Sequence, residues 1–174
     1  MRIRPIVMLA SLYLIGTVPA VLAAETPTDP QIAHIAYTAG VIDVEAAKQA
    51  LAKSKNKEVR DFAKNMVRDH KAVNAKALAL AKKLKIKPED NNTSKALTEA
   101  AKTERAKLGK LHGAAFDKAY IDNEVAYHKQ VNNDLETVLI PSASNAELKS
   151  LLETGLKVFQ GHEQHAEQVA AKLQ

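Results

Sequence analysis

The chain has 174 residues, no cysteine and a formal net charge of +5 at pH 7. This length is typical of a single domain. Without cysteine there is no disulfide framework, no thiol chemistry and no lipidated cysteine after a leader. The charge is too mild to indicate a polyanion partner, and few aromatic residues accompany the lysines, so we predict no nucleic-acid partner. The densest basic cluster falls where a helix should end, and positive charges at a helix C-terminus interact favourably with the helix dipole. Its members are Lys82, Lys83, Lys85 and Lys87.

The N-terminus is typical of a secretion signal. Arg2 and Arg4 precede an apolar run over residues 6–18, and short apolar residues then predict cleavage between Ala23 and Ala24. The run is shorter than the roughly 20 residues that a bilayer span needs, and no later stretch is comparably apolar. We therefore predict no stable membrane span after cleavage, with an uncleaved N-terminal anchor as the alternative.

These features predict two parts, a signal peptide over residues 1–23 and a single domain over residues 24–174. The signal contains two of the 25 basic residues and none of the 20 acidic ones, which leaves the mature chain at +3. The predicted location is the periplasm or the medium.

The mature chain is rich in helix-forming residues, and strand signals are essentially absent. Apolar residues recur at spacings of three and four, as on one face of a helix. A shorter and weaker helix over residues 94–112 is predicted to cross between the second and third long helices. The polar stretch at residues 53–57 predicts a tight turn, with one long bent helix as the alternative. Four long helices are predicted, over residues 30–52, 59–85, 114–140 and 148–173, so the fold class is an all-α four-helix bundle.

Ionisable residues interrupt the apolar stripe of every long helix. At about 13 to 17 residues into each helix, these positions would lie at nearly one level of the bundle. Buried ionisable groups are costly unless they are paired or bound to metal, so a cluster is more plausible than isolated insertions. The candidate metal ligands are Asp43, His70, Glu124, His128 and His162.

Two interpretations of this cluster stay open. Imidazole and carboxylate on facing helices are the means by which bundles hold metals, and these ligands suit zinc, iron, copper, nickel or manganese. Alternatively, the residues form a buried polar network that fixes helix register, or core histidines bonded to carboxylates or carbonyls.

Other polar residues are assigned to lesser roles. Asp69 and Asn74 are predicted to orient the imidazole of His70, and Asp117 to cap or hydrogen-bond across the core. The two tyrosines nearest the cluster are expected to pack at the edge of the core. The remaining histidines are weaker candidates, with a solvent-exposed role favoured for the last: His34, His112 and His165.

The chain resembles the secreted bacterial proteins grouped as domain of unknown function 4142. The resemblance covers residues 29–173 and rests on FAKNMVRDH at 62–70 with Asn74, on FDKAYIDNEVAYH at 116–128, and on His162. It implies a ferritin-like four-helix fold and an expectation of metal, with Asp43 at the position of a family glutamate. The family has no settled activity.

The sequence departs from the di-iron pattern of ferritin-like proteins, which needs a Glu three residues before a His on two helices. Glu124 lies four residues before His128, and Glu163 lies two before His165. A mononuclear or vestigial site is therefore easier to build than a di-iron centre.

The leading functional hypothesis is a periplasmic metal-binding bundle connected with envelope stress or metal handling. The alternative is a non-catalytic structural or interaction protein of the cell envelope, without metal. The sequence shows no nucleophile in a recognisable catalytic setting and no glycine-rich phosphate loop. Catalysis is therefore left open and is not favoured. Protein partners cannot be inferred.

Overall fold

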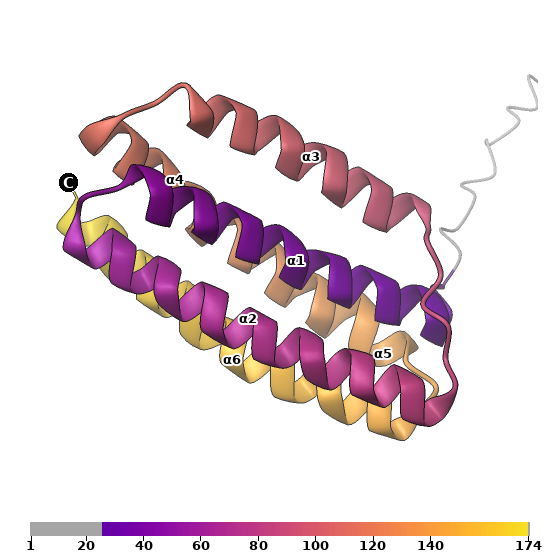
Figure 1. The fold of residues 1–174 in the computed structure, drawn as a ribbon. Coiled ribbons are helices and arrows are strands. Elements are labelled where there is room, and N and C mark those ends of the chain that lie inside the picture. The colour runs from indigo at the N-terminus through magenta and orange to yellow at the C-terminus, as the bar shows by residue number, and fades with distance from the viewer. Residues whose placement is uncertain (1–25, 174) are drawn as a thin grey trace, which may run out of the picture.

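The computed structural model describes residues 26–173, so the predicted signal peptide lies outside the described residues. Within this range the chain is helical and contains no strand. No described helix is long and apolar enough to cross a membrane. The elements, shown in Figure 1, are α1 (Asp29–Lys53), α2 (Lys57–Leu84), α3 (Asn92–Gly109), α4 (Gly113–Asp134), the π-helical turn η1 (Leu135–Leu139), α5 (Ile140–Ser142) and α6 (Ala146–Lys172).

The long helices α1, α2, α4 and α6 form the bundle, while α3 lies outside it along α1 (Figure 1). Helix α1 packs mainly against α2, and α4 packs mainly against α6. Helices α2 and α4 run in the same direction, so the connection between them must return along the bundle, and α3 makes that return (Figure 1). The predicted all-α bundle with a helical crossover is confirmed.

A tight turn separates α1 from α2, so the alternative of one bent helix is wrong. The side chain of Asn56 caps α2 by accepting hydrogen bonds from the backbone N–H groups of Glu58 and Val59. Arg60 donates to the carbonyls of Leu51, at 2.6 Å, and Ser54, at 3.0 Å, which satisfies groups that the end of α1 leaves open.

The third long helix changes its winding before Pro141. A proline ring collides with the carbonyl four residues earlier in a regular α-helix and lacks the N–H that would bond to it. Here the chain widens into η1, where the N–H of Ile140 donates to the carbonyl of Leu135. The helix therefore passes Pro141 and ends at Ser142, slightly beyond the predicted stop.

The end of the bundle that holds the α5–α6 loop is closed by hydrogen bonds from distant parts of the chain. Asp29, in the first turn of α1, accepts from the backbone N–H groups of Ser144 at 2.8 Å and Asn145 at 3.0 Å. The Asn145 side chain in turn caps α6. Asp29 thus acts across the bundle, in addition to lying in the favourable first turn of its own helix.

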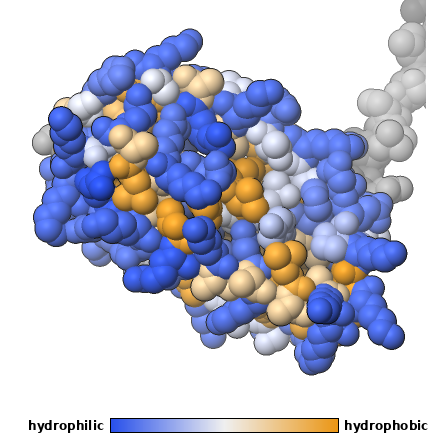
Figure 2. All heavy atoms as spheres, in the orientation of Figure 1, coloured by the Kyte–Doolittle hydropathy of each residue, from blue (hydrophilic) through white to orange (hydrophobic). Residues whose placement is uncertain are grey.

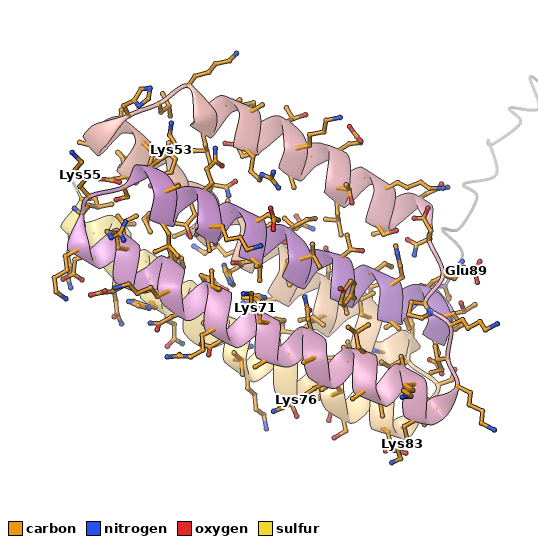
Figure 3. All side chains as sticks on the ribbon, viewed as in Figure 1. Lys53, Lys55, Lys71, Lys76, Lys83 and Glu89 are labelled. Atoms are coloured by element: carbon orange, nitrogen blue, oxygen red, sulfur yellow. The ribbon has the colours of Figure 1, made fainter. Side chains whose placement is uncertain are left out.

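The apolar core consists of two clusters. One contains Phe62, Met66 and Phe116, and the other contains Ile32, Leu135 and Phe159. The buried carboxyl and histidine residues belong to neither cluster. Lysines such as Lys71 and Lys76 project from the outer surface (Figure 3), and the face drawn in Figure 2 is mostly hydrophilic with apolar patches along its middle.

Gly40 of α1 packs closely against the side chain of Asn74 on α2. A Cβ at this position would lie 2.3 Å from Asn74 Oδ1 and 2.9 Å from Asn74 Cγ, so the amide would have to move. We expect Gly40→Ala to be less stable than Gly161→Ala by about 1 to 3 kcal/mol, because alanine favours helix at both positions but overpacks only at position 40. Gly161→Ala is the matched control, because a Cβ there meets nothing within 4 Å and alanine favours helix by about 1 kcal/mol. Urea denaturation of both variants tests this, and equal effects would contradict it.

Candidate metal centre

The five residues predicted as ligands converge in the interior of the bundle. Asp43 comes from α1, His70 from α2, Glu124 and His128 from α4, and His162 from α6. Asp43 is fully buried, and the most exposed of the five, His162, retains 7% of its accessible surface. The spacing of each residue within its apolar stripe turns it inward, and the similar depth along each helix brings the five together.

The carboxylate of Asp43 lies between two imidazoles. Its Oδ2 atom is 3.2 Å from Nε2 of His70 and 3.3 Å from Nε2 of His128. Despite these distances, neither oxygen of Asp43 has a partner with hydrogen-bond geometry among residues 26–173. Short distances without hydrogen-bond alignment are what a set of ligand atoms facing a shared central point would produce.

The donor atoms form two overlapping groups, each compact enough to hold one ion. Nitrogens of His70, His128 and His162 all lie within 4.8 Å of one another, and so do ligand atoms of Asp43, Glu124 and His128. His128 belongs to both groups. The centre therefore has a nitrogen-rich side on α2, α4 and α6 and an oxygen-rich side on α1 and α4.

The imidazole of His128 is oriented by its own helix. Its Nδ1 donates to the backbone carbonyl of Glu124 at 2.9 Å. In the neutral ring this leaves Nε2 as the unprotonated nitrogen, and Nε2 is buried without a hydrogen-bond partner in the described chain. A backbone contact that holds one ring nitrogen so that the other can bind is the usual support of a metal-binding histidine.

His162 is oriented by a carboxylate of a different helix. Its Nε2 lies 3.1 Å from Asp69 Oδ2, and Asp69 is also held by Arg68 through contacts of 2.7 and 2.9 Å. The Nδ1 atom of His162 is buried and unpartnered within the described range. The prediction that Asp69 orients His70 is therefore wrong, because Asp69 orients the imidazole facing it on α6.

His70 is held by packing. Its ring stacks on Phe159 with a centroid distance of 4.6 Å and an interplanar angle of 4°. Neither of its nitrogens has a hydrogen-bond partner in residues 26–173. The prediction that Asn74 orients His70 is also wrong, because the Asn74 amide lies against Gly40 and no described hydrogen bond joins it to an imidazole.

Burial sets the protonation of the centre in the absence of metal. It raises the pKa of Asp43 to about 8, and burial together with the Asp43 charge raises the pKa of Glu124 well above its ordinary value. Burial lowers the pKa of His128 to about 4 and, with the neighbouring imidazoles, lowers that of His70 well below its ordinary value. At neutral pH both carboxyls are largely protonated and these imidazoles uncharged, so a bound cation would displace protons.

The other histidines stand apart from these donor groups. His112 is exposed at the start of α4, and His34 lies in the first half of α1. His165 packs edge-on against Phe62, with a centroid distance of 5.2 Å. His165 is partly buried, so the prediction that favoured a solvent-exposed role for it is wrong.

Of the two tyrosines of α4, Tyr127 is partly buried, as predicted for the core edge, and Tyr120 lies deeper than the sequence suggested. Tyr120 is fully buried, so the prediction that it packs at the core edge is wrong. Its hydroxyl has no partner within the described residues, and burial with the charges of Glu124 and Asp43 raises its pKa. Tyr127 is partly buried and its hydroxyl donates to the carbonyl of Ala39 at 2.8 Å.

Asp117 is also buried, and its Oδ1 has no hydrogen-bond partner in the described chain, so the predicted hydrogen bond across the core is not made by that atom.

The donor set fits a transition-metal ion. Buried polar atoms are nearly always hydrogen-bonded in proteins, yet every one of the five residues has an unpartnered buried atom in the described part of the chain. Three imidazoles and two carboxylates are ligands of zinc, copper, iron, nickel and manganese. Their compact grouping would allow a single ion to contact several of these atoms at once.

The contact between Asp69 and His162 leads to a testable prediction. We expect Asp69→Ala to weaken metal binding about 10-fold to 100-fold, because the His162 ring would lose the partner that fixes its orientation. Asp61→Ala is the control, since Asp61 lies on the same helix and pairs only with exposed lysines. Competition titration against a chelator of known affinity measures both, and equal affinities of the two variants would contradict the role of Asp69.

Comparison with known proteins places the chain in a family. A solved structure described as CopM in the Cu(II)-bound form has a TM-score of 0.67 and 13% sequence identity, and the match covers 86% of this chain and 100% of that one. At this identity the likeness shows a shared fold. No curated protein matches the chain. The family described as Domain of unknown function (DUF4142) matches over residues 17–169, which is most of the chain. The chain therefore belongs to the DUF4142 family.

Proposed function

We propose that this protein is an exported helical bundle that binds a transition-metal ion through Asp43, His70, Glu124, His128 and His162. The observation that carries the proposal is the gathering of ligand atoms of these residues in two groups whose members lie within 4.8 Å of one another, while each residue also has a buried atom without a partner among the described residues. Export rests on the predicted signal peptide over residues 1–23, with cleavage after Ala23. The proposed location is the periplasm or the medium, and the proposed role is metal handling or protection of the envelope.

Copper is the metal that we place first. Nitrogen and oxygen ligands bind Cu²⁺ more tightly than the other divalent ions of the first transition row, so Cu²⁺ should give the highest affinity in vitro. The structural neighbour is described as Cu(II)-bound, which supports the same choice for this fold. Zinc, iron, nickel and manganese remain alternatives, because availability in the compartment decides occupancy as much as affinity does.

A register-fixing polar network is the competing function, and the contacts of His128 and His162 favour it to some extent. Such a network stabilises a core only when its members satisfy one another. Both oxygens of Asp43 and both nitrogens of His70 lack hydrogen-bond partners among the described residues, which is a poor design for a closed network. We therefore prefer the metal site.

The proposal is tested by metal titration of the purified mature chain. We expect about one transition-metal ion per chain, and the double substitution His70→Ala with His128→Ala should abolish binding. The matched control is His34→Ala with His112→Ala, which removes two histidines outside the donor groups and should leave binding intact. Wild-type metal content equal to that of the His70 and His128 double variant would refute the proposal and leave the polar network in its place.

A further inference from the structure

All five donor residues are enclosed, so a metal ion needs a way in. None of them exposes more than 7% of its surface, and most are essentially inaccessible. A hydrated ion cannot pass between the long helices without parting tightly packed residues such as Phe62 and Met66. The position of cavities around the centre therefore decides which route is open.

One cavity, of about 590 Å³, lies between α1, α3 and α4, and we call it the α3 chamber. Its wall includes Asp43 and Glu124, the two carboxyl residues of the centre, and none of the three histidines. It also includes Tyr127 from α4 and Leu108 from α3. The chamber therefore ends against the residues of the oxygen-rich side, although Asp43 and Glu124 expose no more than 1% of their surface.

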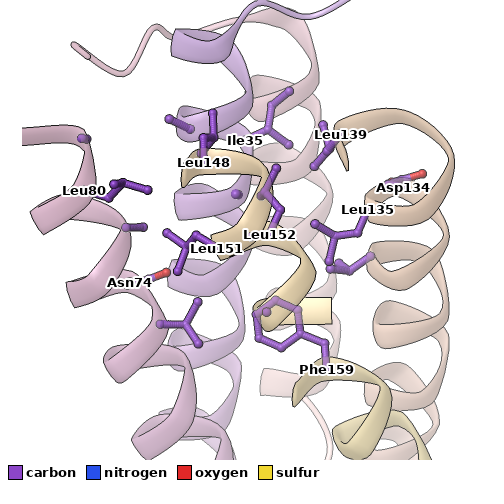
Figure 4. A pocket seen from close by; sticks show the side chains of 18 of the residues that line it. Ile35, Asn74, Leu80, Asp134, Leu135, Leu139, Leu148, Leu151, Leu152 and Phe159 are labelled. Atoms are coloured by element: carbon purple, nitrogen blue, oxygen red, sulfur yellow. The ribbon is translucent and has the colours of Figure 1, made fainter. Parts of the chain in front are cut away.

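The other side of the centre adjoins an apolar cavity of about 60 Å³, shown in Figure 4. Its wall is formed mainly by leucine, alanine and valine side chains and reaches Phe159, which stacks on His70. Asn74 and Asp134 are its polar lining residues among otherwise apolar side chains, and mainly apolar cavities hold little water, so this side offers a hydrated cation few partners. It is a poor route for a metal ion.

Helix α3 covers the chamber with few attachments. Only Ser94 and Leu108, near its two ends, are buried. Near its C-terminal end, Gln49 donates to the carbonyl of Arg105 and Lys53 to that of Gly109, both from α1. A segment with little buried apolar surface opens at lower free energy than the rest of the fold. Helix α3 can therefore move away from α4 while the bundle stays intact.

We propose that hydrated divalent metal ions reach and leave the centre through the α3 chamber, with α3 as the moving cover. On α3 the chamber wall contains the exposed Glu99 and the half-buried Glu104, which pair with Lys102 and Lys107. An incoming cation would pass these two carboxylates before it reaches the buried carboxyls of Asp43 and Glu124 and then the imidazoles. This inference rests on the proposed metal site and adds the route by which the site is loaded.

Two substitutions in the chamber should change the rate of loading in opposite directions. Ala100 is an exposed residue of α3 in the chamber wall, so Ala100→Trp fills the route with little risk to folding. Leu108→Ala removes the buried C-terminal anchor of α3 and should let it open more often. A change of route alters the rates of binding and release equally, so the equilibrium affinity should stay within about threefold of wild type in both variants.

The measurement is stopped-flow mixing of the metal-free mature chain with Cu²⁺, followed by the absorption of the bound ion. We expect Ala100→Trp to slow binding and release at least about 10-fold and Leu108→Ala to accelerate both. Ala75→Trp is the control, because it adds the same side chain at an exposed site in a different groove, between α1 and α2, and should leave the rates unchanged.

The outcomes separate this inference from the metal site itself. Wild-type protein that binds no Cu²⁺ refutes the proposed function. Wild-type binding with unchanged rates in Ala100→Trp refutes the chamber route alone. Faster Cu²⁺ binding by Asp69→Ala, together with unchanged rates in Ala100→Trp, would place the route instead beside His162, whose contact with Asp69 lies near the surface.

Discussion

Binding of Cu²⁺ should raise the free energy of unfolding of the mature chain by about 4 kcal/mol when the free ion is 1,000 times its dissociation constant. The reason is that the folded bundle assembles donors from four helices, which the unfolded chain holds far apart. His128→Gln should remove most of this gain, because His128 belongs to both donor groups. Its effect without metal should be much smaller, since glutamine retains an amide that can hydrogen-bond.

Thermal or urea unfolding with and without Cu²⁺ measures this stabilisation. The control is His112→Gln, which alters an exposed histidine outside the donor groups and should keep the full gain. Equal stabilisation of the two variants would show that Cu²⁺ acts through the surface of the protein and not through the buried centre.

Without metal, we expect Asp43→Asn to be more stable than the wild-type chain at pH 7.5. Burial raises the pKa of Asp43 from its ordinary value of 3.8 to about 8 in the folded protein. The folded state therefore holds a proton that the unfolded state releases. The stability contributed by this group is fully present below pH 3.8 and is lost as pH rises through about 8, by at most about 1.4 kcal/mol per pH unit.

Asparagine has no proton to lose, so the advantage of Asp43→Asn should grow from about pH 4 to about pH 8 and disappear below about pH 4. Urea unfolding in a chelator across this range measures it. Asp122→Asn, at an exposed site paired with Lys118, should stay within about 0.5 kcal/mol of wild type. A variant less stable than wild type at pH 7.5 would contradict the assigned burial of Asp43. With saturating Cu²⁺ the order should reverse, because asparagine supplies no carboxylate.

The four long helices and the five inward-facing polar residues could be predicted because both follow from the period of an α-helix. Asp43, His70, Glu124, His128 and His162 replace apolar residues within continuous stripes, so the same pattern that predicts each helix also predicts which residues face the core. Their similar depth follows from the approximate start of each helix and the rise per residue.

The residues that support the centre could not be predicted in the same way. Adjacency in the chain points Asp69 towards His70, whereas its actual partner, His162, comes from a helix more than 90 residues later. Helical period gives the direction of the Tyr120 side chain but not how thickly neighbouring helices cover it, so its full burial is not foreseen. The α3 chamber depends on packing between three helices, which no single stripe encodes.

The most direct test of the proposed metal centre is a crystal structure of the metal-loaded mature protein with anomalous diffraction data. We expect one dominant anomalous peak within about 2.0 to 2.3 Å of nitrogens of His70, His128 and His162, with a carboxylate oxygen of Asp43 or Glu124 completing the ligands. A peak confined to exposed residues such as His112, with the five buried residues hydrogen-bonded only to one another or to water, would contradict the proposed metal centre.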